Sequence, residues 1–142
     1  MSRTSLAFAA AALVLAAGAA HAETVKFHAD MTGAQEVPPK QTQGTGTVDA
    51  TLDTSSRKLD WTASWQNLTG PATMAHFHGP AAAGANAGVQ VPLGKNPTSP
   101  DHGTATLTPE QVQQLQGGQW YANVHTAANP GGEIRGQMEP AK

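Results

Sequence analysis

Two histidines separated by a single residue, His76 and His78, are the side chains of this sequence best suited to chemistry. In an extended strand successive side chains alternate between the two faces, so residues i and i+2 share a face and stand about 7 Å apart. Two imidazoles placed in this way can share one metal ion. Ala75 and Phe77 then point to the opposite face, which is able to bury apolar area.

A third histidine follows the same pattern in residues 120–126. Every second residue from Trp120 to Val124 is apolar, which leaves His125 on the polar face of the expected strand. Imidazole is the commonest ligand for copper and zinc in proteins. We therefore predict a metal site formed by His76, His78 and His125.

Ligand chemistry limits the metal to a few candidates, and other side chains are candidates for a fourth ligand. All-imidazole sites suit Cu(II), Zn(II) or Ni(II), of which Cu(II) has the highest affinity, so ligand type leaves copper and zinc both open. Three histidines with one open position also fit catalytic zinc. His28 or His102 could be the fourth ligand. Met74 shares the face of His76 and could offer a thioether to Cu(I), although such a methionine more often serves packing.

Composition excludes several other kinds of chemistry. The sequence has no cysteine, so neither a disulfide nor a thiolate is available. No G-x-S-x-G nucleophile elbow occurs, and the carboxylates Glu36, Asp49 and Glu133 are isolated from one another. Without Arg3, seven basic and ten acidic residues remain. This net charge of −3 speaks against binding to nucleic acid or anionic lipid.

Residues 1–22 have the pattern of a secretory signal peptide. Arg3 precedes an apolar stretch over residues 6–17, and Ala20-His21-Ala22 is an A-x-A cleavage site. We predict that this segment is removed and that residues 23–142 form a single domain without a membrane span. The protein is then periplasmic or secreted.

The elements that must position the histidines are short strands of alternating polarity, separated by glycine and proline. One short helix is expected after Thr108, because Thr108, Pro109 and Gln111 form a capping box with proline at N1, and Gly117 ends it. Residues 94–103, which include His102, are expected to be a loop. The pattern predicts an all-β antiparallel sandwich or flattened barrel. The predicted strands cover residues 25–31, 45–52, 59–66, 72–78, 89–93, 104–107, 120–126 and 133–137.

The in-phase apolar residues of these strands form the predicted core. They are Phe27, Val48, Leu52, Leu59, Trp61, Trp65, Phe77, Val89, Val91, Leu107, Trp120, Val124 and Ile134.

Several stretches together resemble the CHRD domain, the module named after chordin and common in bacterial secreted proteins. The matching segments are residues 33–39, 75–81, 107–108, 121–126 and 129–137. The resemblance implies an immunoglobulin-like β-sandwich. It does not imply a particular enzyme activity, because the family is better known as a protein module than as an enzyme.

The chain is also similar, more loosely, to copper-zinc superoxide dismutase, a Greek-key β-barrel with a His-x-His strand and a late-strand histidine outside its core. The resemblance implies that His76, His78 and His125 are copper ligands. The chain lacks the disulfide and a recognisable zinc-binding loop, so the resemblance implies a copper-only site.

Arg135 is expected to share the face of His125 and to lie close to the metal. There it would attract superoxide or another small anion. The alternative is that it pairs with Glu133 or another acid.

Two hypotheses follow from the sequence. The first is an exported copper-binding β-sandwich with a three-histidine surface site, active in copper binding or superoxide dismutation. The second is a non-catalytic extracytoplasmic interaction or adhesion module, in which the sheet binds a protein or polysaccharide.

Overall fold

The computed structural model describes residues 21–142. Most of the predicted signal peptide, residues 1–20, lies outside the described residues. Within residues 21–142, no helix has both the length and the apolar character needed to cross a membrane.

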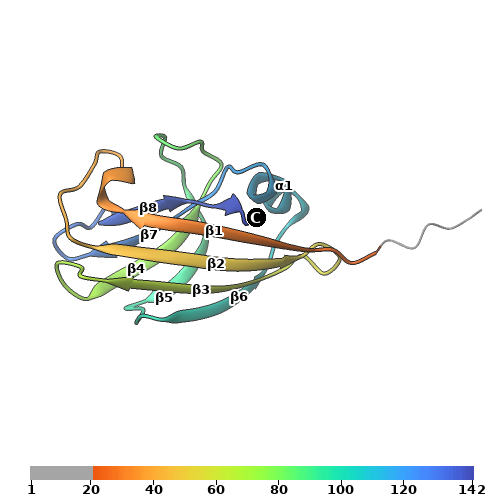
Figure 1. The fold of residues 1–142 in the computed structure, drawn as a ribbon, viewed down its shortest axis with the longest axis horizontal. Coiled ribbons are helices and arrows are strands. Elements are labelled where there is room, and N and C mark those ends of the chain that lie inside the picture. The colour runs from red at the N-terminus through yellow and green to blue at the C-terminus, as the bar shows by residue number, and fades with distance from the viewer. Residues whose placement is uncertain (1–20) are drawn as a thin grey trace, which may run out of the picture.

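Nine strands, one α-helix and one 3-10 turn make up the described chain (Figure 1). The strands are β1 (Thr24–Thr32), β2 (Thr45–Asp53), β3 (Lys58–Gln66), β4 (Ala72–His78), β5 (Val89–Lys95), β6 (Asp101–Thr106), β7 (Tyr121–Thr126), β8 (Ile134–Gln137) and β9 (Glu139–Pro140). The 3-10 turn η1 (Gly33–Gln35) follows β1, and the helix α1 (Pro109–Gln116) lies between β6 and β7.

The strands form one continuous antiparallel sheet in the order β5-β4-β7-β8-β1-β2-β3-β6, with β9 beside β1. The end strands β5 and β6 approach each other, so the sheet is nearly closed into a barrel. Figure 1 shows β1, β2 and β3 in front, with β4 and β7 crossing behind them. The predicted all-β antiparallel class and single short helix are confirmed. Two separate sheets, as in a sandwich, are not seen, because the hydrogen-bonded ladder is unbroken.

Alternation of polar and apolar residues explains which face of each strand is inside. In β3, Leu59, Trp61 and Ala63 are buried, whereas the residues between them are exposed or half-buried. Phe77 of β4 packs edge-on against Trp61 and stacks on Trp120, with ring centroids 5.4 and 5.9 Å apart. Burial of each large side chain contributes about 1.5–3 kcal/mol relative to exposure.

Eleven of the thirteen predicted core residues are buried. The exceptions lie at the ends of strands, where the sheet covers less area. Val89 begins the edge strand β5 and is 51% exposed, and Trp65, near the end of β3, is only partly buried. The helix follows its predicted signals: Thr108 accepts from the Gln111 backbone N–H, and the Gln111 side chain accepts from the Thr108 N–H.

Glu133, a carboxylate with no exposed surface, connects three loops at one end of the barrel. Its oxygens accept hydrogen bonds from the hydroxyls of Thr42, Thr69 and Thr126, from the backbone N–H of Thr69, and from the Asn129 amide. Burial raises the pKa of Glu133, but these hydrogen bonds outweigh burial and hold it at about 2. The ionised carboxylate is therefore part of the folded structure.

We expect Glu133→Gln to destabilise the protein by about 2–4 kcal/mol, because the amide NH₂ would face hydrogen-bond donors in a buried site. Urea unfolding at pH 7 measures the loss. Because the folded pKa is depressed, the stabilisation is fully present above the unfolded pKa, near pH 4.5, and is lost as the pH falls toward 2. The shift is worth roughly 3 kcal/mol.

The exposed Glu139→Gln is the matched control, since its side chain lies on the surface. It should leave both the stability at pH 7 and its decline between pH 5 and pH 2 unchanged. If Glu133→Gln kept the wild-type decline in acid, the stabilising role of the Glu133 carboxylate would be refuted.

Candidate metal centre

The three predicted histidines meet on the outer face of the barrel, where β4 lies beside β7. One ring nitrogen from each of His76, His78 and His125 lies within 4.8 Å of the other two. His76 Nδ1 is 3.2 Å from His125 Nε2. Within residues 21–142 this is the one group of three or more His, Asp or Glu side chains whose ligand atoms converge in this way.

The register of β4 against β7 brings these side chains together. His76 is paired with Asn123, Met74 with His125, and His78 with Tyr121. Directly paired residues of antiparallel strands share a face, so the His-x-His pair and His125 all project outward.

The site is less open than the predicted surface site. His78 and His125 are 9% and 6% exposed, and only His76 is half-buried. Two loops fold back over this part of the sheet and carry Ala87 and Pro130, whose carbonyl oxygens contact the histidines. Strand alternation assigns a face to each residue, but it does not report whether a loop covers that face.

The two loop carbonyls determine which ring nitrogens carry protons. His78 Nδ1–H donates to Ala87 O at 3.0 Å, and His125 Nδ1–H donates to Pro130 O at 2.8 Å. In neutral imidazole, protonation of Nδ1 leaves Nε2 with a lone pair. Nε2 of both buried histidines is therefore free to act as a ligand, as in metal sites where a carbonyl fixes the histidine tautomer.

Asn123, which the sequence analysis did not select, completes the cluster. Its Oδ1 lies 2.9 Å from His78 Nε2 and 3.0 Å from His125 Nε2. Three atoms that can all act as acceptors thus face one another, and His76 Nδ1 is the neighbouring atom that can donate a proton. Acceptors that face one another with no donor between them are a set of lone pairs that a cation could take.

Burial and neighbouring groups favour the neutral form of His76 and His78. Burial, followed by the neighbouring His125 and His78, lowers the pKa of His76 to about 4. Burial also lowers the pKa of His78, although the Ala87 carbonyl and the Asn123 side chain favour its protonated form and oppose this shift. An imidazolium form of His78 is therefore disfavoured at neutral pH, and the ring lone pairs are available to a metal.

The distances suit a transition metal. Two ligand atoms about 2.0–2.1 Å from a shared ion lie about 2.9 Å apart at a right angle and about 3.3 Å apart at the tetrahedral angle. The separations of 3.2, 3.0 and 2.9 Å between neighbouring donor atoms fall in this range. These separations fit copper or zinc, and the three imidazole nitrogens lie within 4.8 Å of one another.

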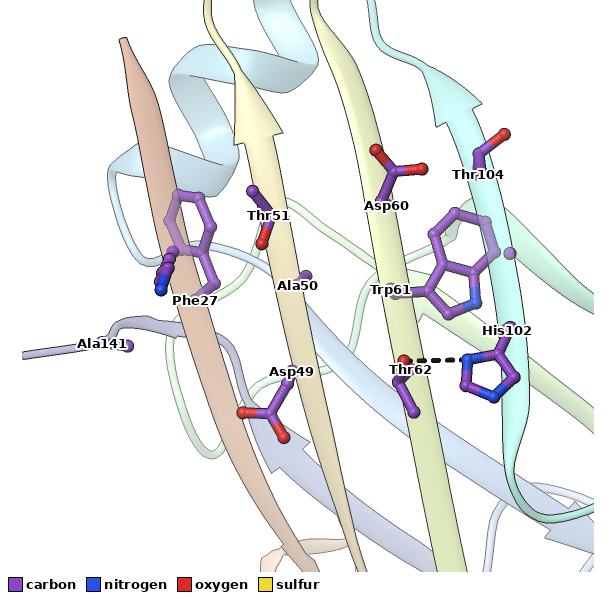
Figure 2. A pocket seen from close by; sticks show the side chains of 12 residues that line it. Phe27, Asp49, Ala50, Thr51, Asp60, Trp61, Thr62, His102, Thr104 and Ala141 are labelled. Atoms are coloured by element: carbon purple, nitrogen blue, oxygen red, sulfur yellow. Dashed lines mark hydrogen bonds between the residues drawn. The ribbon is translucent and has the colours of Figure 1, made fainter.

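The proposed fourth histidines are not brought to the cluster. His28 lies on β1, which β8 and β7 separate from β4, and its ring nitrogens contact Asp49 and Asp30 at 2.7 and 3.1 Å. Hydrogen bonds to Asp49 and Asp30 raise its pKa. His102 lies on β6 rather than in a loop, and its Nδ1 is 2.9 Å from the Thr62 hydroxyl of β3. Figure 2 draws this hydrogen bond.

Arg135 lies on the predicted face, is paired with Asn123, and is only 2% exposed. Its guanidinium lies 3.5 Å from the centre of the Tyr121 ring, and that ring stacks on His78. It donates to Asn86 Oδ1 at 2.9 Å and to Ala85 O. It forms no ion pair with an acid among residues 21–142, and its role toward an anion stays a prediction.

Glu36 is a second residue that the sequence analysis did not connect with the site. It is 4% exposed, and the amide nitrogen of Asn123 faces its carboxyl group across Gly132. Burial raises the pKa of Glu36 to about 7, against the opposing effect of Arg135. A Cβ at Gly132 would lie 2.4 Å from Glu36 Oε1, so glycine is required for this approach.

Asn123 was accessible to sequence reasoning, because it shares the polar row of His125. Glu36 was not, since it lies in an irregular segment whose position no local pattern predicts.

Comparison with known proteins agrees with the first resemblance. A family model of the CHRD domain matches residues 27–138, a range that includes all three clustered histidines, Asn123, Glu36 and Arg135. No curated protein and no solved structure matches the chain. The resemblance to copper-zinc superoxide dismutase therefore stays a prediction. The chain belongs to the CHRD domain family.

Proposed function

We propose that this CHRD domain is an exported copper-binding protein whose ligands are His76, His78 and His125. The observation that carries the proposal is the convergence of three imidazoles, two of which present unprotonated Nε2 atoms because loop carbonyls hold their Nδ1 protons. Membership of the CHRD domain family supports an extracellular setting.

Ligand type and spacing favour copper over zinc. Imidazole suits both metals, but Cu(II) binds more tightly and accepts tetragonal sites of nitrogen and oxygen. The Asn123 oxygen and its two Nε2 neighbours are separated by about the distance expected for ligands at right angles. Asn123 is therefore the best placed fourth donor.

A redox role is the more specific form of the proposal. Bound copper would supply one-electron chemistry, in which one superoxide is oxidised to O₂ and a second, with two protons, is reduced to hydrogen peroxide. The half-buried His76 marks the side that solvent reaches, whereas loops cover His78 and His125. Arg135 adds a positive charge over the Tyr121 ring. This charge favours the approach of an anion to the proposed copper site.

A non-catalytic interaction module is the second candidate. Family membership favours it, because a CHRD domain is a module of extracellular proteins. In that case the three imidazoles would form only a buried polar cluster.

The purified mature protein should retain about one equivalent of Cu(II) after loading and desalting, because a preformed multi-imidazole site binds Cu(II) tightly. A variant with His76, His78 and His125 changed to Ala should retain less than about a tenth of an equivalent. Metal analysis by mass spectrometry measures both values.

The control variant carries His28→Ala and His102→Ala, which also removes imidazoles but leaves the cluster intact. It should bind as much copper as the wild type. Equal copper in all three proteins would refute the ligand assignment, and no copper in the wild type would refute the metal proposal itself.

If the redox form of the proposal holds, the copper-loaded protein should consume superoxide catalytically. Arg135→Gln should lower the rate several-fold and flatten its dependence on ionic strength, because a positive charge that attracts the anion is lost. Stopped-flow or pulse-radiolysis measurements give the rates, with bound copper measured in the same samples. A fully loaded wild type that does not consume superoxide would eliminate the redox role and leave copper binding.

A further inference from the structure

A cavity of about 250 Å³ lies beside the metal centre, between the segment after β1 and the loop after β4. Its walls include Glu36, Val37 and Pro39 on one side and Ala83 on the other, and the β8 side chains Arg135 and Gln137 also line it. None of the three histidines lines this cavity. It is therefore a space distinct from the proposed copper site.

The cavity contains a buried positive charge that forms no ion pair, although the Glu36 carboxyl group, on whose pKa this charge acts, also lines the cavity. Arg135 is 2% exposed, and no carboxylate of the described chain lies within ion-pair distance of it. Two of its five N–H groups donate to Asn86 and to the Ala85 carbonyl. A buried cation is costly unless an anion compensates it. The guanidinium is thus able to receive an anion that enters the cavity.

The same walls contain acceptors that lack donors. Within residues 21–142, the buried side-chain nitrogen and oxygen atoms without a partner are Glu36 Oε1 and Gln137 Oε1. The orientation of Gln137 is set, since its Nε2 donates to the carbonyls of Ala81 and Gly118, each at 2.8 Å. Both orphaned oxygens belong to side chains that line the cavity.

From this combination we infer that the cavity binds a small carboxylate that carries a neighbouring hydroxyl or ammonium group. The carboxylate pairs with the Arg135 guanidinium, whose planar fork matches its geometry. The neighbouring donor reaches the oxygen of Gln137 or Glu36. The volume corresponds to that of roughly eight water molecules, which limits the ligand to a few heavy atoms.

The test uses metal-free mature protein in the presence of a chelator, so its outcome does not depend on copper binding. Titration calorimetry at pH 7 and constant ionic strength compares glycolate, glycine and acetate, with chloride as the control anion. We expect glycolate or glycine to bind at least tenfold more tightly than acetate, because acetate lacks the second donor, and chloride to produce no saturable heat. Equal responses to all four would indicate a general salt effect and overturn the inference.

Two variants separate the parts of the site. Arg135→Lys keeps the charge but loses the bidentate fork, so it should weaken binding about tenfold. Gln137→Met removes an acceptor and should reduce the preference for glycolate over acetate to about twofold or less. Arg57→Lys is the matched control, because Arg57 does not line the cavity, and it should bind like the wild type.

Thermal unfolding of each variant shows whether it is folded. If Arg135→Lys fails to fold, Gln137→Met still decides the question. An unchanged preference for glycolate in a folded Gln137→Met protein would refute the predicted donor contact to Gln137, and unchanged affinity in folded Arg135→Lys would refute the carboxylate contact to Arg135.

Discussion

A single buried carboxylate, that of Glu133, holds together the end of the barrel on which the histidine cluster depends. It accepts hydrogen bonds from the loop before β2, from the loop before β4 and from the β7–β8 hairpin. These segments are rich in polar residues, proline and glycine, and Leu68 in the loop before β4 packs against the core. Because Glu133 remains ionised, the polar contacts that replace water are strong and directional.

The hairpin that Glu133 holds also carries Pro130, whose carbonyl directs the tautomer of His125. The loop between β4 and β5 has the same effect on His78 through Ala87, and Arg135 and Tyr121 hold that loop in place. Backbone carbonyls on loops, rather than other side chains, therefore orient the ring nitrogens of the histidine cluster. The sheet determines where the imidazole rings lie, and the loop carbonyls determine which ring nitrogen of His78 and of His125 carries the proton.

The outer face of β4, β7 and β8 consequently behaves as a second, polar core. His78, Asn123 and Arg135 are as well buried as several apolar residues inside the barrel, and each contacts neighbouring polar groups. Low exposure strengthens electrostatic interactions and favours the neutral form of His76 and His78. The small cavity next to Arg135 is the part of this layer where the guanidinium forms no ion pair and two buried side-chain oxygens accept no hydrogen bond.

The sequence by itself determined the all-β class, the faces of the strands, the capped helix and the grouping of His76, His78 and His125. These features depend on alternation and spacing over a few residues, which backbone geometry translates directly into direction. Tertiary structure alone decided that one sheet nearly closes into a barrel, that loops cover His78 and His125, and that Asn123 joins the cluster while His28 and His102 do not. Those outcomes depend on which segments, distant in the sequence, contact each other. A local pattern does not identify the distant segment that a given residue will contact.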